Sequence, residues 1–193
     1  MKSLILASSS IYRKKLLDTL GFDYQCASPD IDETVHKDET SAQLVARLAL
    51  AKAQKVAHRH SNSLIIGSDQ AATVDGIILN KPLTTAKAQQ QLQLCSGKKV
   101  TFLTGLCLFD SSDNSHQLAT IAYHVYFREL SSAEIAHYIA IEQPLNCAGS
   151  FKVEGLGISL FEKLEGDDFN SLIGLPVIEL LNMLRAKGIN PLS

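Results

Sequence analysis

The sequence contains no tryptophan, two methionines and four cysteines among its 193 residues. No two cysteines are spaced as C-x-x-C, and their neighbours are mostly apolar, which favours reduced, mostly buried thiols over disulfides or a zinc site. The cysteines are Cys26, Cys95, Cys107 and Cys147. The chain also has no excess of positive charge, because 20 acidic residues outnumber 18 lysines and arginines and give a formal net charge of −2. The chain lacks the overall basic field that holds nucleic acid, so a substrate anion must be bound by locally placed cations.

Long apolar runs are missing as well. No run approaches the length of a membrane span, so we expect no membrane association. The first seven residues resemble the start of a signal peptide, but the apolar run is too short and the basic segment 13–15 follows it. We therefore expect a cytoplasmic protein. Hydrophobic residues make up 46% of the chain, enough to fill a sizeable core in one domain or in two closely packed lobes that share a sheet.

Strand and helix signals alternate early in the chain, and two long strand signals lie together in its middle. Strands are predicted at 4–7, 22–27, 64–66, 100–109, 118–127 and 157–162, and helices at 11–20, 40–58, 84–94, 131–142 and 176–187. Thr40 with Gln43, and Ser131 with Glu134, form capping boxes. Asp75-Gly76 predicts a hairpin turn. This pattern indicates an α/β fold with a mixed sheet covered by helices.

A serine turn, Ser8 to Ser10, leads into a helix whose first turns carry Arg13, Lys14 and Lys15. Cations in this position oppose the positive end of the helix dipole, at a cost of about 0.3–1 kcal/mol each. Unpaired amide groups at a helix start bind anions, so a bound anion would turn this cost into a gain. The alternative is three exposed basic residues that tolerate the penalty.

Acidic side chains offer a second kind of site. Asp69 and Gln70 follow the strand predicted at 64–66, and a carboxylate at a strand end could hold a metal or orient a water molecule. Taken alone, Asp69 is better explained as the cap of a turn. The acidic loop around Asp32 offers oxygen ligands for Mg²⁺ or Mn²⁺, although a solvated loop is the ordinary interpretation. Lys52 and Lys81, each taken alone, indicate only surface cations.

Short motifs follow one another along nearly the whole chain, from Leu4 to Pro191. They are Leu4-Ile5-Leu6-Ala7-Ser8 with Arg13, Asp32-Glu33-Thr34, Lys52-Ala53, Gly67-Ser68-Asp69-Gln70, Lys81-Pro82-Leu83, Ser96-Gly97, Ala148-Gly149-Ser150-Phe151, Glu154-Gly155 and Gly174-Leu175-Pro176. In order and spacing they resemble the Maf family of nucleoside triphosphate pyrophosphatases. The resemblance implies a single Maf-type pyrophosphatase domain over residues 1–193. It also implies an elongated mixed β-sheet flanked by helices, with two lobes around a central cleft, as in inosine-triphosphatase-like folds.

The resemblance also implies a hydrolase that acts on acid anhydrides. Such an enzyme converts a nucleoside triphosphate into a monophosphate and diphosphate with a divalent metal, Mg²⁺ or Mn²⁺. Asp69 matches the family's catalytic position and would deprotonate or orient water, and Glu33 with Asp69 matches the positions near the metal. The family's phosphate-binding positions are matched by Ser8, Arg13, Lys52 and Lys81. Cations on the leaving diphosphate and carboxylates around the metal are what this reaction requires.

Three positions bear on which nucleotide is used. The thymidine/uridine triphosphate branch of the family tends to have arginine, threonine and glutamine where this sequence has Tyr12, Gln70 and Glu154. At Gln70 and Glu154 the sequence resembles the 7-methyl-GTP branch, which often carries tryptophan in place of Tyr12. Methylation gives guanine a positive charge, which an aromatic face binds with about 0.5–2 kcal/mol. A carboxylate at Glu154 could accept hydrogen bonds from the guanine N1–H and N2–H groups.

We therefore predict hydrolysis of 7-methyl-GTP to 7-methyl-GMP and diphosphate, which would remove modified nucleotides from the pool. One alternative is a dTTP/UTP pyrophosphatase of the same family. Another is a non-catalytic nucleotide-binding regulator of cell division or septum formation, although a pure sensor would not need the whole set of charged residues. The expected partner is a small nucleotide, with neither nucleic acid nor membrane, and the resemblance suggests a homodimer.

Overall fold

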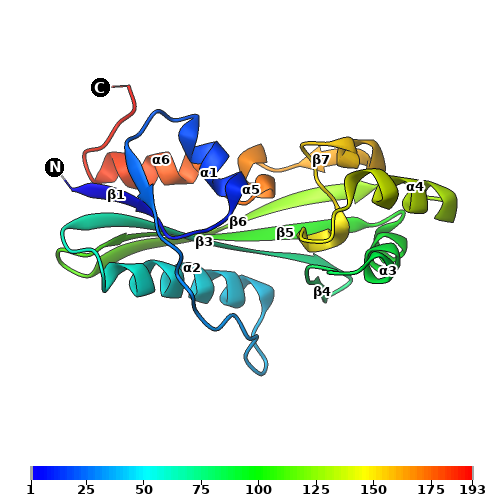
Figure 1. The fold of residues 1–193 in the computed structure, drawn as a ribbon, viewed down its shortest axis with the longest axis horizontal. Helices are drawn as coiled ribbons and strands as arrows, with labels where there is room; N and C mark the ends of the chain where they lie inside the picture. The colour runs from blue at the N-terminus through cyan, green and yellow to red at the C-terminus, as the bar shows by residue number, and fades with distance from the viewer. Residues whose placement is uncertain (1, 193) are drawn as a thin grey trace. The chain divides into compact units, whose positions relative to one another are not determined.

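The computed structural model describes residues 2–192, and its strands form a mixed seven-stranded sheet in the order β2-β1-β3-β5-β6-β7, with β4 paired to β3 (Figure 1). The strands are β1 (Ser3–Leu6), β2 (Tyr24–Cys26), β3 (Ser63–Val74), β4 (Ile77–Leu79), β5 (Lys99–Asp110), β6 (Ser115–Phe127) and β7 (Phe161–Glu165). Strand β1 pairs in parallel with β2 and β3, whereas the β3–β4 and β6–β7 pairs are antiparallel. The predicted α/β class with a mixed sheet is confirmed.

Helices flank the sheet at the places that their capping signals predict. The helices are α1 (Ile11–Asp18), α2 (Ser41–Ala57), α3 (Thr85–Cys95), α4 (Ser132–Glu142), α5 (Phe169–Ile173) and α6 (Val177–Ala186), with 3₁₀ helices η1 (Ala148–Ser150) and η2 (Leu156–Leu160). Both predicted capping boxes are present, at the starts of α2 and α4. Among residues 2–192, no helix combines the length and the apolar character that crossing a bilayer requires.

The chain divides into two compact units. The first contains the described residues up to Asp69, Thr104–Ile121 and the residues from Asp168 onward, and the second contains Gln70–Leu103 and Ala122–Asp167. In the first unit, successive side chains of β1, β3 and β5 point to opposite faces of the sheet. Leu4, Leu6, Leu64, Ile66, Leu106 and Leu108 pack with residues of α1 and α6. Ile5, Ile65, Cys107 and Phe109 pack with residues of α2, which covers the other face (Figure 1).

The second unit is built around an aromatic cluster. Phe151 lies 4.8 Å from Phe161 and 5.3 Å from Phe102 between ring centroids, and Phe127 lies 4.9 Å from Phe161. The ring planes meet at 72–81° in these pairs, which is the favoured edge-to-face arrangement. These four rings join β5, β6, β7 and the residue that follows η1 into one core.

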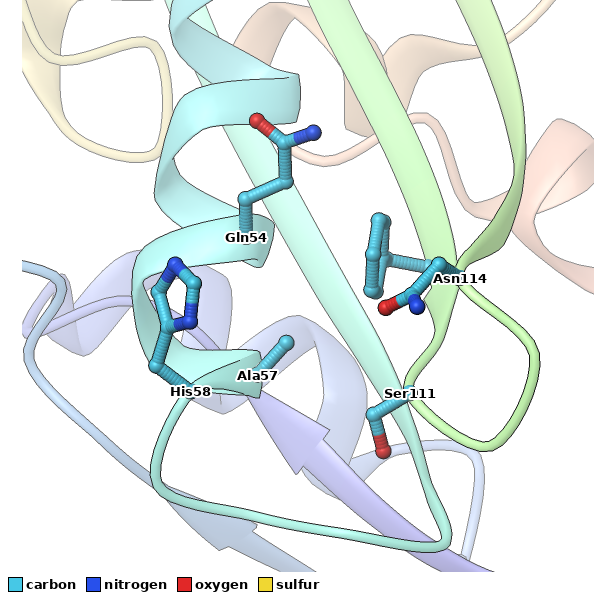
Figure 2. Close-up of a pocket in the computed structure, with 6 residues that line it drawn as sticks. Gln54, Ala57, His58, Ser111 and Asn114 are labelled. Carbon is cyan, nitrogen blue, oxygen red and sulfur yellow. The ribbon is translucent and has the colours of Figure 1, made fainter.

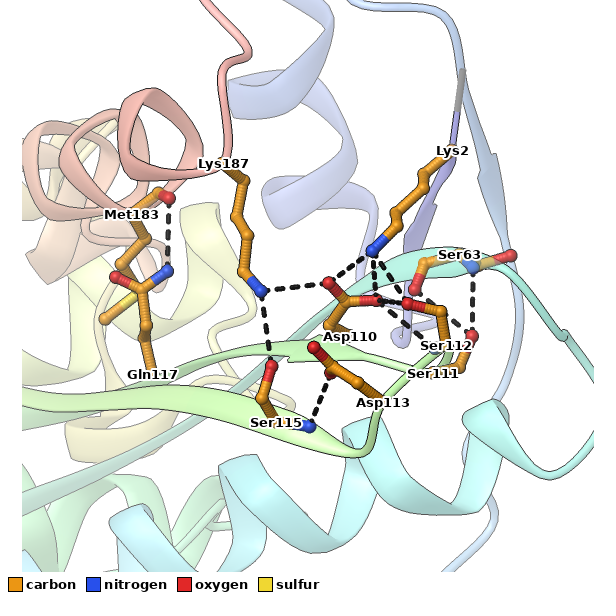
Figure 3. Close-up of polar contacts among 10 residues, drawn as sticks. All are labelled: Lys2, Ser63, Asp110, Ser111, Ser112, Asp113, Ser115, Gln117, Met183 and Lys187. Atoms are coloured by element: carbon orange, nitrogen blue, oxygen red, sulfur yellow. Dashed lines mark hydrogen bonds and ion pairs between the residues drawn. The ribbon is translucent and has the colours of Figure 1, made fainter.

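Asp110, at the end of β5, ties distant segments of the first unit together (Figure 3). The residue is 1% exposed, and its carboxylate accepts hydrogen bonds from Lys2 Nζ at 2.7 Å, Lys187 Nζ at 2.9 Å and Ser112 Oγ at 2.7 Å. Burial alone would raise the pKa of Asp110, but these hydrogen bonds outweigh it and hold the pKa below its usual range. The N-terminal strand, the β5–β6 turn and the end of α6 therefore meet at one buried charge.

Two local predictions are wrong, and one short helix was not predicted. The strand predicted at 64–66 does not end there, because β3 continues to Val74, where it pairs with β4 across the predicted Asp75-Gly76 turn. The segment predicted as a strand from Gly157 forms η2 instead, in which Gly157 N donates to Lys152 O, and β7 starts only at Phe161. Helix α5 was not predicted, because five residues are too few for helical periodicity.

Candidate active site

A buried lysine joins two carboxylates in the first unit. Lys52, on α2, is 6% exposed, and its Nζ lies 2.6 Å from Asp69 Oδ1 and 2.6 Å from Glu33 Oε1. Asp69 is buried in β3, whereas the Glu33 side chain is 55% exposed on the loop before α2. A buried ammonium group without partners is costly, so these carboxylates explain why Lys52 is tolerated. The interpretation of Lys52 as a surface cation is wrong.

Gly67 allows α2 to lie close enough for this contact. A Cβ atom at Gly67 would lie 2.1 Å from the Ala49 carbonyl oxygen and 3.0 Å from Ala53 Cβ. A Cβ atom at Gly105 would lie 2.2 Å from the Val45 carbonyl oxygen. Helix α2 therefore rests directly on the backbone of β3 and β5, and this close approach brings Lys52 within reach of Asp69.

The charges around Asp69 tune its acidity in both directions. Burial raises the pKa of the Asp69 carboxyl above its ordinary value, and the charge and hydrogen bond of Lys52, together with the charge of Arg13, oppose that rise. The charge of Glu33 adds to it. The net direction is upward, and a carboxylate whose pKa moves toward neutrality becomes a better general base. Asp69 is therefore suited to accept a proton from water.

Arg13 lies in the first turn of α1, which follows the serine turn in the chain. Ser10 is the N-cap of α1, and its Oγ accepts from Arg13 N at 3.4 Å. The Arg13 guanidinium donates from Nε to the carbonyl oxygen of Gly174 at 2.7 Å, and its Nη1 lies 3.5 Å from the buried Ser8 Oγ, a weak contact. Desolvation lowers the pKa of Arg13, and the negative charges of Asp69 and Glu33 oppose this. Arg13 thus shares one electrostatic environment with the two carboxylates.

Arg47 holds the loop that presents Glu33. Its Nη2 donates to the Thr34 carbonyl oxygen at 3.0 Å, and its Nε lies 2.6 Å from Glu39 Oε1. Asp32 accepts from Thr34 N at 2.9 Å and from Thr34 Oγ1 at 2.6 Å. Asp32 therefore stabilises a turn of this loop. Sequence reasoning missed Arg47, and its only signal was an arginine on the long helix that follows an acidic loop.

The first unit also contains Tyr12, which is partly exposed on α1 beside Arg13. The structure thus brings Ser8, Arg13, Glu33, Lys52 and Asp69 together in one unit.

The other predicted site residues, Gln70, Lys81 and Glu154, belong to the second unit. Gln70 follows Asp69 in β3, and Lys81 is exposed between β4 and α3.

Glu154 is an exposed carboxylate on a well-held loop between η1 and η2. Glu142 fixes this loop, because its Oε1 accepts from Leu156 N at 2.7 Å and its backbone carbonyl accepts from Lys152 Nζ. Tyr138 OH accepts from Lys152 N at 3.0 Å. The loop is therefore anchored by its neighbours, and the Glu154 carboxylate is left on the surface.

A pocket of about 350 Å³ lies elsewhere in the first unit, at the end of α2 and the turn between β5 and β6 (Figure 2). It is lined by Gln54, Ala57, His58, Phe109, Ser111 and Asn114. No carboxylate, lysine or arginine is among these lining residues, so the pocket lacks the charges that a triphosphate and its metal require. The candidate active site is the charged cluster around Asp69.

The donor set of the cluster can be tested against a divalent metal. Among residues 2–192, no group of three or more histidine, cysteine, aspartate or glutamate side chains could hold a metal ion. Asp69 and Glu33 supply two carboxylates, both paired with Lys52. Mg²⁺ is usually bound by one or two carboxylates together with substrate phosphates and water. The two carboxylates therefore fit a metal that arrives with a nucleotide.

A family model described as "Maf-like protein" matches residues 3–187. The chain belongs to the Maf family. As a Maf-family nucleotide pyrophosphatase, it is a hydrolase that releases diphosphate. A solved structure described as "The structure of the Staphylococcus aureus Ham1 protein" aligns with 81% of this chain and 90% of that chain, at 13% sequence identity and a TM-score of 0.48. The family prediction and the prediction of an enzyme are confirmed.

Proposed function

We propose that this Maf protein hydrolyses 7-methyl-GTP to 7-methyl-GMP and diphosphate with Mg²⁺ or Mn²⁺, and that Asp69 is the general base. The observation that carries the proposal is the buried Lys52, which holds Asp69 and Glu33 at 2.6 Å each. A nucleotide brings negative phosphates and a divalent metal to this cluster. Lys52 and Arg13 would bind the phosphates, and the two carboxylates would hold the metal.

In this reaction a water molecule attacks the α-phosphorus of the nucleotide. Asp69 takes one proton from the water, and the new P–O bond forms as the bond from the α-phosphorus to the bridging oxygen breaks. The electron pair of that bond leaves with diphosphate, whose charge is bound by Lys52, Arg13 and Lys81. When bound, the divalent metal neutralises phosphate charge. The upward shift of the Asp69 pKa supports its role as the base.

We assign recognition of the nucleobase to Tyr12, Gln70 and Glu154. The assignments of Gln70 and Glu154 to selection of the nucleobase, and of Lys81 to diphosphate binding, rest on the family resemblance. Two properties of this chain support the roles of Tyr12 and Glu154: Tyr12 is partly exposed next to Arg13, and Glu154 is exposed on a loop that other residues anchor. A tyrosine face would stack on the cationic base, and the Glu154 carboxylate would accept its N1–H and N2–H groups.

The test is a substrate panel scored for diphosphate release, with 7-methyl-GTP, GTP, dTTP and UTP. We expect the highest kcat/KM for 7-methyl-GTP, and a shift toward the pyrimidine nucleotides in a Tyr12→Arg/Glu154→Gln variant. Asp69→Asn should lower kcat by about 10²–10⁴-fold, because it removes the general base. Asp75→Asn changes an exposed turn carboxylate and is the matched control, so its turnover should equal that of the unsubstituted protein.

Each outcome bears on a separate part of the proposal. A higher kcat/KM for dTTP or UTP would mean that 7-methyl-GTP is not the preferred substrate, and it would leave the hydrolytic mechanism unaffected. An unchanged substrate ranking in the Tyr12/Glu154 variant would remove these residues from base selection. Undiminished turnover by Asp69→Asn would remove Asp69 as the base.

A further inference from the structure

Ser68 lies on β3 between Gly67 and Asp69 and is completely buried. Its side chain points to the face of the sheet opposite to Asp69, because successive side chains of a strand alternate. The hydroxyl donates to the carbonyl oxygen of Gly174 at 3.0 Å. The same oxygen accepts from Arg13 Nε at 2.7 Å. A hydroxyl on the strand of the general base therefore shares one acceptor with the phosphate-binding arginine.

Gly174 has a backbone conformation with positive φ, which favours glycine. Gly174 follows the end of α5 and has a φ of +124°, which side-chain-bearing residues rarely adopt, and its N–H donates to the Asn170 carbonyl. A carbonyl oxygen has two lone pairs, and Ser68 and Arg13 use both. Ser68 thus limits the direction in which the oxygen can point and so the position of the Arg13 Nε.

The segment around Gly174 has other anchors that do not involve Ser68. Thr104 Oγ1, which is buried on β5, donates to the Ser171 carbonyl oxygen at 2.8 Å. The Asp168 carboxylate accepts from Asn170 N at 2.9 Å and from Ile178 N at 2.8 Å, at the starts of α5 and α6. Helix α5 should therefore remain on the sheet when the bond from Ser68 is removed.

We propose that Ser68 is a positioning residue for Arg13, acting through the Gly174 carbonyl. The bond to this carbonyl fixes the Nε side of the guanidinium and directs the Nη2 group toward the phosphates of the bound nucleotide. This role rests on the proposed function of Arg13 in phosphate binding. Because the guanidinium is planar, fixing Nε also fixes its other donors. Ser68 touches neither the substrate nor the reacting atoms in this arrangement.

The test compares Ser68→Ala with Thr104→Ala, which removes a matched buried hydroxyl-to-carbonyl bond in the same part of the fold. Binding of inorganic diphosphate with Mg²⁺, measured by calorimetry, should weaken about fivefold in Ser68→Ala and by less than twofold in Thr104→Ala. KM for the nucleotide turned over fastest should rise by a similar factor. The thermal midpoints of the two variants should fall by similar amounts. Ser68→Cys, which keeps the side-chain volume with a weaker donor, serves if Ser68→Ala does not fold.

A second comparison uses Arg13→Lys, whose side chain has no guanidinium for Ser68 to position. In that background Ser68→Ala should cause no further loss of diphosphate binding, because the two residues act as one unit. Equal weakening by Ser68→Ala and Thr104→Ala, or full additivity of Ser68→Ala with Arg13→Lys, would overturn the positioning role. If no nucleotide in the panel is hydrolysed but the diphosphate results hold, the proposed reaction fails and the role of Ser68 stands.

Discussion

Replacing Lys52 with methionine gives the sharpest test of the charged cluster. Methionine keeps an unbranched side chain of nearly the same length, with sulfur in place of one methylene, and lacks the ammonium group, so packing is largely preserved. The Lys52 and Asp69 side chains are 8% and 12% exposed, and removing one partner of such a pair costs about 3–5 kcal/mol. The pair with Glu33 adds at most about 1 kcal/mol, because Glu33 is 55% exposed. We expect a loss of about 3–6 kcal/mol in the free energy of unfolding at neutral pH.

The pH dependence of this loss has a definite sign. Burial already raises the pKa of Asp69 above its ordinary value of 3.8, and Lys52 opposes that rise, so the pKa should be still higher in Lys52→Met. A carboxyl whose pKa is higher in the folded than in the unfolded state loses stability as the pH rises through the folded value. The deficit should therefore be smallest near pH 4. It should grow by up to about 1.4 kcal/mol per pH unit and level off above the Asp69 pKa of the variant.

Urea unfolding followed by circular dichroism, at several pH values between 4 and 8, measures this effect. The control is Lys98→Met, because Lys98 pairs with Asp75 at 2.7 Å and both side chains are exposed, so its loss should be within about 1 kcal/mol. Adding Asp69→Asn to Lys52→Met removes the unpaired charge and should restore much of the stability. The reasoning fails if Lys52→Met costs no more than Lys98→Met, or if its deficit does not change with pH.

Two further perturbations follow from the packing and charges of the first unit. Gly67→Ala places a Cβ 2.1 Å from the Ala49 carbonyl oxygen and should force α2 away from β3. The free energy of unfolding, measured in urea, should fall by about 1–3 kcal/mol, and the rate of diphosphate release should fall as well. Normal turnover would contradict the close approach of α2 to β3. Asp110→Asn should cost about 1.5–3 kcal/mol at pH 7, because it removes charged hydrogen bonds from two lysines whose side chains are 33% and 26% exposed. Because the pKa of Asp110 is lowered in the folded state, the stability lost in Asp110→Asn should be greatest above pH 3.8 and smaller at lower pH. A loss that does not change with pH would contradict the role given to the Asp110 charge.

Local signals in the sequence predicted the long elements well. The capping box at Thr40 and Gln43 predicted the start of α2, and the Asp75-Gly76 turn predicted the β3–β4 hairpin. The end of β3 was misplaced, because the residues after Ile66 are not strongly apolar. The last residues of β3, Ala72 to Val74, pair with β4, a contact that a local sequence pattern does not contain.

The sequence predicted which residues form the candidate site better than it predicted the contacts between them. Motif spacing singled out Lys52 and Asp69, but the burial of Lys52 depends on how closely α2 approaches β3, which Gly67 decides. The bond between Ser68 and Gly174 joins residues 106 positions apart in the chain. Such long-range contacts arise from the packed fold, and no periodicity in the sequence encodes them.

Successive side chains of β3 point to opposite faces of the sheet, which explains why Gly67, Ser68 and Asp69 make different contacts. Gly67 and Asp69 face α2, where one lets the helix approach and the other meets Lys52, whereas Ser68 faces the opposite side and meets Gly174. A one-residue shift in the register of β3 would turn each side chain to the wrong face. Leu64 pairs in parallel with Leu4 and Ile66 with Leu6 of β1, and this register sets the face to which each following residue of β3 points. The register of β1 with β3 therefore sets not only the core but also which face of the sheet carries Asp69 and which carries Ser68.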